Sequence, residues 1–511
     1  MPILASFMVP HPPLIVPAVG RGGEKEVIKT IRSYEKVADE IAALKPETIL
    51  ITSPHATLYA DYFHISPGKH AKGSFAGFHA PQVKFSEDYD EDLVDRISEI
   101  AYHEDFPCGT MGEQEPELDH GTMVPLWFIR QKYKDGKIVR IGLSGLPLTD
   151  HYRLGTILAR AANALNRRAV IVSSGDLSHK LQDYGPYGFA PEGPQYDERI
   201  MDVMGRAAFG ELFNFDEAFC DKAAECGHRS FVIMAGAWDG RPVRATTCSH
   251  EDITGVGYGI CSFYPGTPGP SIDSTSAADS MTDSDPDSDS DADSTCASDS
   301  DADSEAEALF SADRQFLRIY LEKKENEINK MREASDIYVR LARLSLETYI
   351  RTGKKIRIPE DLSLLTGEIP DALLHTRAGA FVSIHKQGML RGCIGTIGPT
   401  MKNLAQEIAT NAISASTRDP RFDPIREDEL PWLEINVDVL GEAEDIDSMD
   451  QLDVKRYGVI VSTRDGRRGL LLPDLDGVDT VEEQVAIAMR KGGIQTHEKY
   501  QLQRFEVVRH T

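Results

Sequence analysis

Cysteine is scarce in this 511-residue chain, which has only seven. They stand at the scattered positions Cys108, Cys220, Cys226, Cys248, Cys261, Cys296 and Cys393. No two of them form a C-x-x-C pair, which excludes a disulfide framework and a zinc ribbon. Such sparse cysteine is typical of a reducing compartment, so we expect a cytoplasmic location.

Long apolar runs are also absent, since no stretch reaches the roughly 18–20 apolar residues that a membrane span needs. The N-terminal segment MPILASFMVPHPPLIVPAVG is apolar, but it has no basic start and its prolines interrupt a helix, unlike a secretion signal. No G-x-G-x-x-G motif follows an expected strand, so a dinucleotide site is not supported. We therefore expect a soluble protein with no membrane partner.

Positive charge is in deficit, with 55 Lys and Arg against 82 Asp and Glu and a formal net charge of −27. A chain this acidic lacks the basic surface that binds a phosphate backbone, so nucleic acid is not an expected partner. Residues 271–310 alone hold eleven Asp, two Glu and no basic residue. Because residues 266–308 have almost no large apolar side chains, we predict that they form a disordered acidic Ser/Asp linker between two globular regions.

Short β-branched runs alternate with helical patterns in the first region, residues 1–265. The expected strands are 3–9, 48–52, 137–143, 169–173 and 256–263, and the expected helices are 24–44, 152–166, 195–208, 216–224 and 229–237. This alternation predicts an α/β fold with a largely parallel central sheet flanked by helices. Three of the strands end in loops that carry His11, His55 and His179, at the edge where such sheets bind ligands.

Two imidazoles and one carboxylate on one face of a metal leave adjacent positions open, which suits a non-haem Fe(II) oxygenase. His11, His55 and an acid from residues 216–237 could form such a set. The same two imidazoles could instead hold Zn²⁺, which would polarise a water or a carbonyl.

Five motifs in the first region resemble the class III extradiol dioxygenase (LigB-like) family. They are VPHPP at 9–13, SPHAT at 53–57, LDHGTMVPL at 118–126, SSGDLSHK at 173–180 and ECGHRSFVIMAGA at 225–237. The resemblance implies a catechol-type aromatic substrate, a homodimer, and Fe(II) bound by His11, His55 and Glu225. It also implies that His179 is the acid–base residue and that His120 contacts the substrate.

The run Glu225-Cys226-Gly227 departs from this pattern and resembles the Memo-like branch of the same superfamily. In that branch a cysteine before a glycine stands at the metal position, which would make Cys226 the third ligand. A thiolate ligand favours copper or zinc over iron. Two functions therefore remain open: ring cleavage by a dioxygenase, and a metal-binding role without ring cleavage.

A second region, 309–511, begins with a helical pattern that we expect to run from residue 309 to residue 351. The expected strands are 380–384, 433–440, 459–461 and 470–473, and the expected helices are 404–414 and 481–490. This pattern predicts a smaller α+β domain with a leading helix.

The motif LRGCIG at 390–395, together with RDPRFDPI at 418–425, resembles the AMME chromosomal-region protein family. In the motif, Gly392 and Gly395 would permit close backbone approach, and Arg391 could hold an anion through two hydrogen bonds. Cys393 is either a reactive thiolate near positive charge or a small structural residue in a tight strand–turn. The role of the motif stays undefined at this point.

Together the two resemblances identify a fusion of two components of the microbial AmmeMemoRadiSam system. The third component is a radical S-adenosylmethionine enzyme, so the resemblance implies such an enzyme as a functional partner. The chain lacks the C-x-x-x-C-x-x-C cluster motif and is not that enzyme itself.

Overall fold

The computed structural model describes residues 2–114, 116–266, 315–475 and 477–511. The chain divides into two compact units, Met1–Leu321 and Glu322–Thr511. The predicted linker 266–308 lies outside the described residues apart from residue 266, and so does the start of the predicted leading helix.

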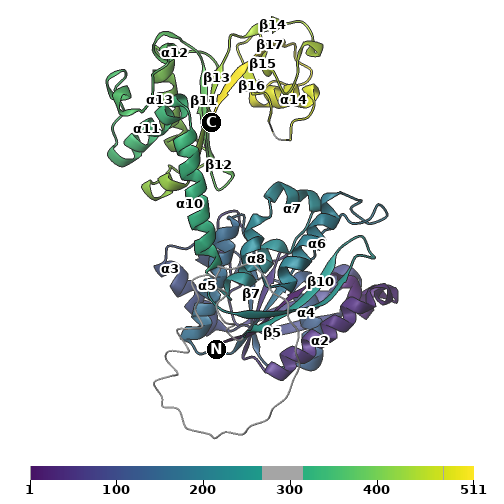
Figure 1. Ribbon diagram of the computed structural model, residues 1–511. Coiled ribbons are helices and arrows are strands. Elements are labelled where there is room, and N and C mark those ends of the chain that lie inside the picture. Colours follow the sequence, from purple (N-terminus) through teal and green to yellow (C-terminus); the bar gives the residue numbers. More distant parts are fainter. Residues whose placement is uncertain (1, 115, 267–314, 476) are drawn as a thin grey trace, which may run out of the picture. The chain divides into compact units, whose positions relative to one another are not determined.

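A six-stranded sheet forms the centre of the first unit, in the order β7-β2-β8-β1-β10-β9 (Figure 1). Its strands are β1 (Ile3–Val9), β2 (Thr48–Ser53), β7 (Lys137–Gly142), β8 (Ala169–Ser174), β9 (Val243–Glu251) and β10 (Tyr258–Pro265). The neighbours β7, β2, β8 and β1 are parallel, whereas β10 and β9 complete the sheet in antiparallel pairing. The predicted α/β fold with a largely parallel central sheet is confirmed.

Helices cover both faces of this sheet (Figure 1). Along β2, Leu50 belongs to one hydrophobic core, while Ile49 and Ile51 belong to the core on the other face, because successive side chains of a strand alternate. The first core includes residues of α3 (Glu91–His103), α5 (Leu148–Ala164), α6 (Glu192–Gly205), α7 (Glu217–Ala223) and α8 (His228–Gly236). The second core includes residues of α2 (Ile28–Leu44) and α4 (His120–Lys132).

Several elements of the first unit were not predicted from the sequence: α3, α4, β9, and the hairpin of β4 (His70–Phe75) and β5 (Ala80–Asp88). The strand β9 is mostly half-buried or exposed, so its sequence lacks the apolar run that marks the inner strands. The helix α4 begins inside the DHG motif, where the side chain of Asp119 accepts a hydrogen bond from the Thr122 amide and caps the helix.

The second unit contains two antiparallel four-stranded sheets, with orders β12-β11-β13-β18 and β14-β17-β15-β16. The first sheet comprises β11 (Ala380–Lys386), β12 (Met389–Gly395), β13 (Leu433–Leu440) and β18 (Val507–His510). The second comprises β14 (Glu444–Ile446), β15 (Gly458–Ser462), β16 (Arg468–Leu471) and β17 (Gln501–Phe505). Helix α13 (Leu404–Thr417) shares a core with the first sheet, and α14 (Val481–Lys491) shares a core with the second. The predicted α+β class of this region is confirmed.

The prediction of one helix over residues 309–351 is wrong. The described part of this segment forms two helices, α10 (Phe316–Ala334) and α11 (Ile337–Thr352). The helix is interrupted at Ser335 and Asp336. The Asp336 carboxylate accepts hydrogen bonds from the amides of Tyr338 and Val339. An aspartate that satisfies the first amides of α11 stabilises a new helix start at this point.

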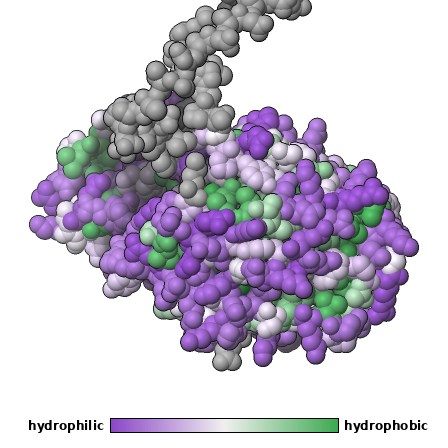
Figure 2. Space-filling view, turned by 90° about the horizontal axis from the view of Figure 1, so that it is seen from below, coloured by the Kyte–Doolittle hydropathy of each residue, from purple (hydrophilic) through white to green (hydrophobic). Residues whose placement is uncertain are grey.

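None of the helices in the described ranges combines the length and the apolar composition that crossing a bilayer requires. The face shown in Figure 2 is mainly hydrophilic, with hydrophobic residues in scattered groups.

Candidate metal centre

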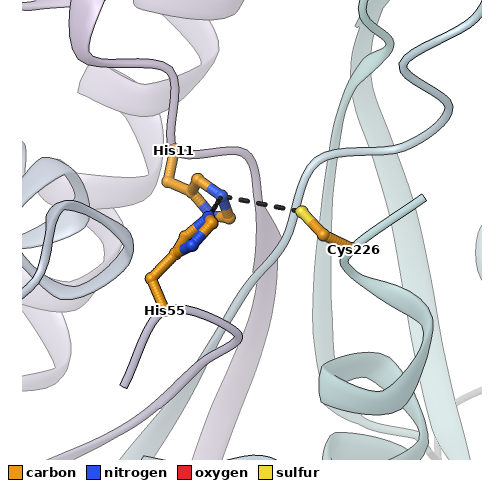
Figure 3. A group of neighbouring side chains, drawn as sticks. All are labelled: His11, His55 and Cys226. Atoms are coloured by element: carbon orange, nitrogen blue, oxygen red, sulfur yellow. Dashed lines mark hydrogen bonds between the residues drawn. The ribbon is translucent and has the colours of Figure 1, made fainter. Parts of the chain in front are cut away.

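Three of the predicted site histidines lie in loops that follow adjacent parallel strands. His11 follows β1, His55 follows β2 and His179 follows β8, and these strands are neighbours in the order β2-β8-β1. Because parallel strands end at the same edge, the fold gathers these loops where α/β sheets bind ligands. The loop before α8 adds Cys226, which faces His11 and His55 (Figure 3).

The donor atoms of His11, His55 and Cys226 converge within binding distance of a single ion. The Nε2 atoms of His11 and His55 are 3.0 Å apart, and the His11 Nε2 lies 3.6 Å from the Cys226 Sγ. Tetrahedral coordination with ordinary metal–ligand bond lengths places two nitrogens about 3.3 Å apart and a nitrogen and a sulfur about 3.6 Å apart. The three side chains therefore fit a bound metal.

A hydrogen-bond chain fixes which nitrogen of His11 faces this centre. The Ser174 hydroxyl donates to the Gly121 carbonyl oxygen over 2.6 Å, and it lies 2.9 Å from the His11 Nδ1. A hydroxyl has one proton to donate, so it must accept from Nδ1–H of His11. The lone pair of His11 is then on Nε2, the nitrogen next to Cys226, as metal binding requires.

Burial keeps the imidazoles of the centre neutral. It lowers the pKa of His11 to about 3, and the charge of His55 acts in the same direction. Burial also lowers the pKa of His120 to about 4, again assisted by His55. The pKa of His55 is lowered by burial as well, although Asp119 opposes the shift. Neutral imidazoles have the free lone pair that a metal needs.

An ion pair beneath the centre orients the loop that carries His55. The Asp119 carboxylate accepts from the Arg140 guanidinium over 2.6 Å and from the Ser53 hydroxyl over 2.6 Å. The Ser53 oxygen in turn accepts from the His55 amide over 3.2 Å. Asp119, Arg140 and Ser174 were not among the predicted site residues, because nothing in the sequence shows that they contact the histidines.

Glu225, the predicted third ligand, is not part of the group of donor atoms that His11, His55 and Cys226 form. Its carboxylate accepts a hydrogen bond of 2.6 Å from the His228 amide at the start of α8. The residue is half-buried, and its desolvation raises its pKa to about 7 against the opposing effect of that amide bond. The neighbouring Cys226, the alternative that the sequence left open, has its sulfur beside the two histidines.

His179 and Asp176 complete the other side of the centre. The His179 Nδ1 lies 2.6 Å from the Ala224 carbonyl oxygen, so this nitrogen carries the proton in the neutral ring and the Nε2 has the lone pair. That Nε2 is 4.0 Å from the Asp176 carboxylate. Asp176, His179 and Cys226 form a second group whose donor atoms could hold a metal. Asp176 was not predicted to be a site residue.

His120 lies beside the same two histidines. Its ring centre is 4.0 Å from that of His55, 5.4 Å from that of His11 and 5.4 Å from that of Phe78. The histidine is therefore placed where a molecule bound beside the two candidate ligands would touch it.

The LRGCIG residues of the second unit lie on β12. Arg391 forms two hydrogen bonds with the Glu429 carboxylate, of 3.0 and 2.9 Å, so the anion that it holds belongs to its own unit. A side chain at Gly392 would meet the Ala415 carbonyl oxygen of α13 at 2.2 Å, which explains the glycine. Gly395 ends the strand opposite Phe381, and Cys393 is half-buried.

Family models match both parts of the chain. Residues 5–261 match the model described as the catalytic LigB subunit of aromatic ring-opening dioxygenase. The chain therefore belongs to this family, which is named after the catalytic subunit of an oxidoreductase. Residues 339–510 match the AMMECR1 model, so the second unit is an AMMECR1 domain. Both family resemblances predicted from the motifs are confirmed.

A protein of Clostridium acetobutylicum is 37% identical over 512 residues, which covers 99% of this chain and 98% of the relative. A shorter protein of Thermotoga maritima is 49% identical over 175 residues, 34% of this chain and 96% of its own length. The crystal structure of an uncharacterised protein from Pyrococcus horikoshii shares 31% sequence identity with this chain, with a TM-score of 0.31. The match covers 35% of this chain and 90% of the Pyrococcus chain.

Proposed function

We propose that the first unit is a metal-binding protein that holds a soft cation, copper or zinc, through His11, His55 and Cys226, and that it does not cleave catechol rings. The observation that supports this proposal is that the Cys226 Sγ lies 3.6 Å from the His11 Nε2, while the Glu225 carboxylate accepts a hydrogen bond from the His228 amide at the start of α8. A thiolate with two imidazoles selects copper and zinc over the Fe(II) of a two-histidine, one-carboxylate site.

When bound, the metal would supply a Lewis acid that polarises a ligand donor atom. The surrounding residues then determine where a proton goes. His179 presents the lone pair of its Nε2 toward the centre, because its Nδ1 is held by the Ala224 carbonyl. A molecule that reaches the centre can therefore lose a proton to His179, and Asp176, 4.0 Å away, stabilises the imidazolium that results.

The dioxygenase function is a second candidate because the two other histidines that the resemblance implies for it lie near His11 and His55. His179 and His120 flank the two candidate ligands, as ring cleavage would require. The carboxylate that such a centre needs is also available from another residue, since the Asp176 Oδ2 lies 3.9 Å from the His11 Nε2. In this function His179 would accept the catechol proton.

Anaerobic metal titration distinguishes the two functions. Full-length wild type, Cys226→Ala and Glu225→Gln are titrated with Cu(I), Zn²⁺ and Fe(II), and Cys248→Ala serves as the control for losing a thiol elsewhere. We expect one soft metal per chain in the wild type. Cys226→Ala should weaken its binding by about 100-fold or more, which exceeds the usual loss of an outer-shell partner.

Glu225→Gln and Cys248→Ala should bind the metal as the wild type does. Retention of the metal by Cys226→Ala, together with Fe(II)-dependent oxygen uptake on catechols that is lost in His179→Gln, would overturn the soft-metal proposal in favour of ring cleavage.

A further inference from the structure

Large apolar side chains gather at the surface of the first unit, in two neighbouring loops near the metal centre. Tyr184, Tyr187 and Phe189 belong to the segment that follows His179, and their exposed fractions are 74%, 60% and 50%. Ile253, in the turn between β9 and β10, is 47% exposed. Single exposed apolar side chains are common on proteins, whereas a group of them on one surface marks a place where a partner binds.

Hydrogen bonds join the two loops into one surface. The Leu181 amide donates to the Gly255 carbonyl oxygen over 3.2 Å, and the Tyr184 hydroxyl donates to the Ile253 carbonyl oxygen over 3.4 Å. A Cβ at Gly255 would lie 2.7 Å from the Gly185 Cα, so the two backbones are in close contact. We call the surface formed by Tyr184, Tyr187, Phe189 and Ile253 the aromatic patch.

The aromatic patch borders the metal centre. The ring centre of Tyr187 lies 5.2 Å from that of His179, and the two ring planes are at 88° to each other. Edge-to-face contacts of this kind are favourable and orient the rings. A molecule that covers the aromatic patch therefore lies beside His179.

The charges of the two loops are negative. Leu181 pairs with Phe189, and the hairpin 181–189 between them carries one acid, Asp183, and no base. The turn 252–257 also carries one acid, Asp252, and no base. Asp183 is exposed and Asp252 is half-buried. A second copy of this chain, with a formal net charge of −27, would be repelled, whereas a cationic partner would be attracted.

We propose that the aromatic patch binds a cationic polypeptide segment, in which an apolar side chain stands next to Arg or Lys. The apolar side chain packs on Phe189 and Ile253. The cation lies over a tyrosine ring, where the ring quadrupole and the carboxylates of Asp183 and Asp252 attract it. The bound segment lies beside His179, but its binding does not depend on the proposed metal.

Fluorescence anisotropy of labelled peptides tests the proposal on the full-length, metal-free protein. Three short peptides of equal length alternate Arg with Trp, Arg with Ser, and Glu with Trp. The acidic residues 271–310 also attract basic peptides, but charge alone does not distinguish the two Arg peptides. We expect the Arg-Trp peptide to bind roughly tenfold more tightly than either of the others, because it alone offers both the cation and the apolar anchor.

Variants of the patch should remove this preference. In the double variant Tyr184→Ser, Tyr187→Ser, the Arg-Trp and Arg-Ser peptides should bind equally. Tyr102→Ser is the matched control, because it removes a tyrosine that is 83% exposed on α3, outside the patch, and it should bind as the wild type does. Asp183→Asn should weaken Arg-Trp binding severalfold. Salt at about 1 M, where the screening length is roughly 3 Å, should abolish that difference.

Hydrogen exchange locates the site without a variant. The bound Arg-Trp peptide should slow amide exchange in residues 181–189 and 252–257. Unchanged Arg-Trp binding in the double variant, equal binding of the Glu-Trp and Arg-Trp peptides, or protection confined to other residues would each overturn the proposal. Binding of phosphatidylcholine vesicles that the double variant loses, without a preference among the peptides, would assign the aromatic patch to a membrane surface instead.

Discussion

The metal centre of the first unit and the LRGCIG strand of the second unit both bury polar side chains, but they satisfy them differently. At the centre, His11 and His55 present neutral nitrogens to each other and to the Cys226 thiol. On β12, by contrast, the charge of Arg391 is matched inside the fold by Glu429. Neutral metal-ligating atoms that converge on one point indicate an external ligand. An ion pair whose two charges both belong to the fold indicates a structural role instead.

This difference separates two kinds of motif residue. The VPHPP, SPHAT and ECGHRSFVIMAGA motifs of the first unit supply the groups that would touch a ligand. In LRGCIG, Arg391 and Gly392 hold the strand against its own unit. A strong motif is therefore not by itself a list of reactive residues.

The largest effect is expected from a substitution that removes Glu429, the internal partner of Arg391. Burial raises the pKa of Glu429, but hydrogen bonds from Arg391, the Arg426 amide and Lys386 outweigh it and hold the pKa at about 2. Glu429→Gln leaves two cations uncompensated and should lower the free energy of unfolding of the second unit by about 3–5 kcal/mol in denaturant titrations at pH 7.

Glu427→Gln, at an exposed position in the same short helix, is the matched control and should change stability by less than about 0.5 kcal/mol. A carboxyl group whose pKa is lower in the folded than in the unfolded state stabilises the fold at pH values above its unfolded pKa, here about 4.5. The difference between wild type and Glu429→Gln should therefore shrink as the pH falls from about 4.5 toward 2. Equal stabilities at pH 7 would show that the ion pair is not a support.

A smaller effect is expected where the two ligand loops of the first unit touch. A Cβ at Gly175, next to Asp176, would lie 2.1 Å from the Gly227 Cα, next to Cys226. Gly175→Ala should push the Cys226 loop from His11, weaken metal binding, and destabilise the first unit by about 1–3 kcal/mol. Calorimetric metal titration and thermal unfolding measure the two effects.

Gly77→Ala is the control, because a Cβ there meets no atom within 4 Å and the backbone is not in the left-handed region. This variant should bind metal as the wild type does. Unchanged metal affinity in Gly175→Ala would mean that the position of Cys226 does not depend on this contact.

The smallest effect concerns pH. His151, buried in the first unit, has its pKa lowered to about 3 by burial. The unfolded chain therefore binds a proton at higher pH than the folded chain, and the contribution of His151 to stability is lost as the pH falls from 6.5 toward 3. The loss amounts to at most about 1.4 kcal/mol per pH unit.

His151→Asn should remove the pH-dependent contribution of His151 to stability. As the pH is lowered from 6.5 to 5.5, the stability of this variant relative to wild type should therefore rise in urea titrations. The exposed His103→Asn should leave the pH dependence unchanged. Parallel slopes for wild type and His151→Asn would contradict the assignment of acid sensitivity to buried neutral histidines. The second unit, supported by carboxylates such as Glu429, should begin to lose stability only below about pH 4.5.

Much of the first fold follows from the sequence, because inner parallel strands are continuous β-branched runs with distinct ends. The prediction failed where two signals compete. The helical period continues across Ser335 and Asp336, yet Asp336 is also a strong helix start, and the cap prevails because it satisfies two amides. Strand β9 was missed because it is only partly buried.

For the site, the sequence places His11 and His55 correctly after strands of the parallel part of the sheet, but it cannot decide between Glu225 and Cys226. Neighbouring residues point in different directions, and the outcome depends on the start of α8. One local signal was available: an acid just before a helix start can accept a hydrogen bond from a free first-turn amide, as Glu225 does from His228. Contacts such as Ser174 with His11 join residues 163 positions apart and leave no local trace.

The hydrogen bond from the Cys393 amide to Asp419 also protects the protein from aggregation. Strand β12 lies at the edge of its sheet, and it pairs only with β11. Free amides on such an edge can recruit a strand from another molecule. Asp419 occupies one of these donors with a negative charge, so an incoming strand would meet a carboxylate where it needs an amide. Asp419, which pairs with Arg421, thus also works against the extension of this sheet between molecules.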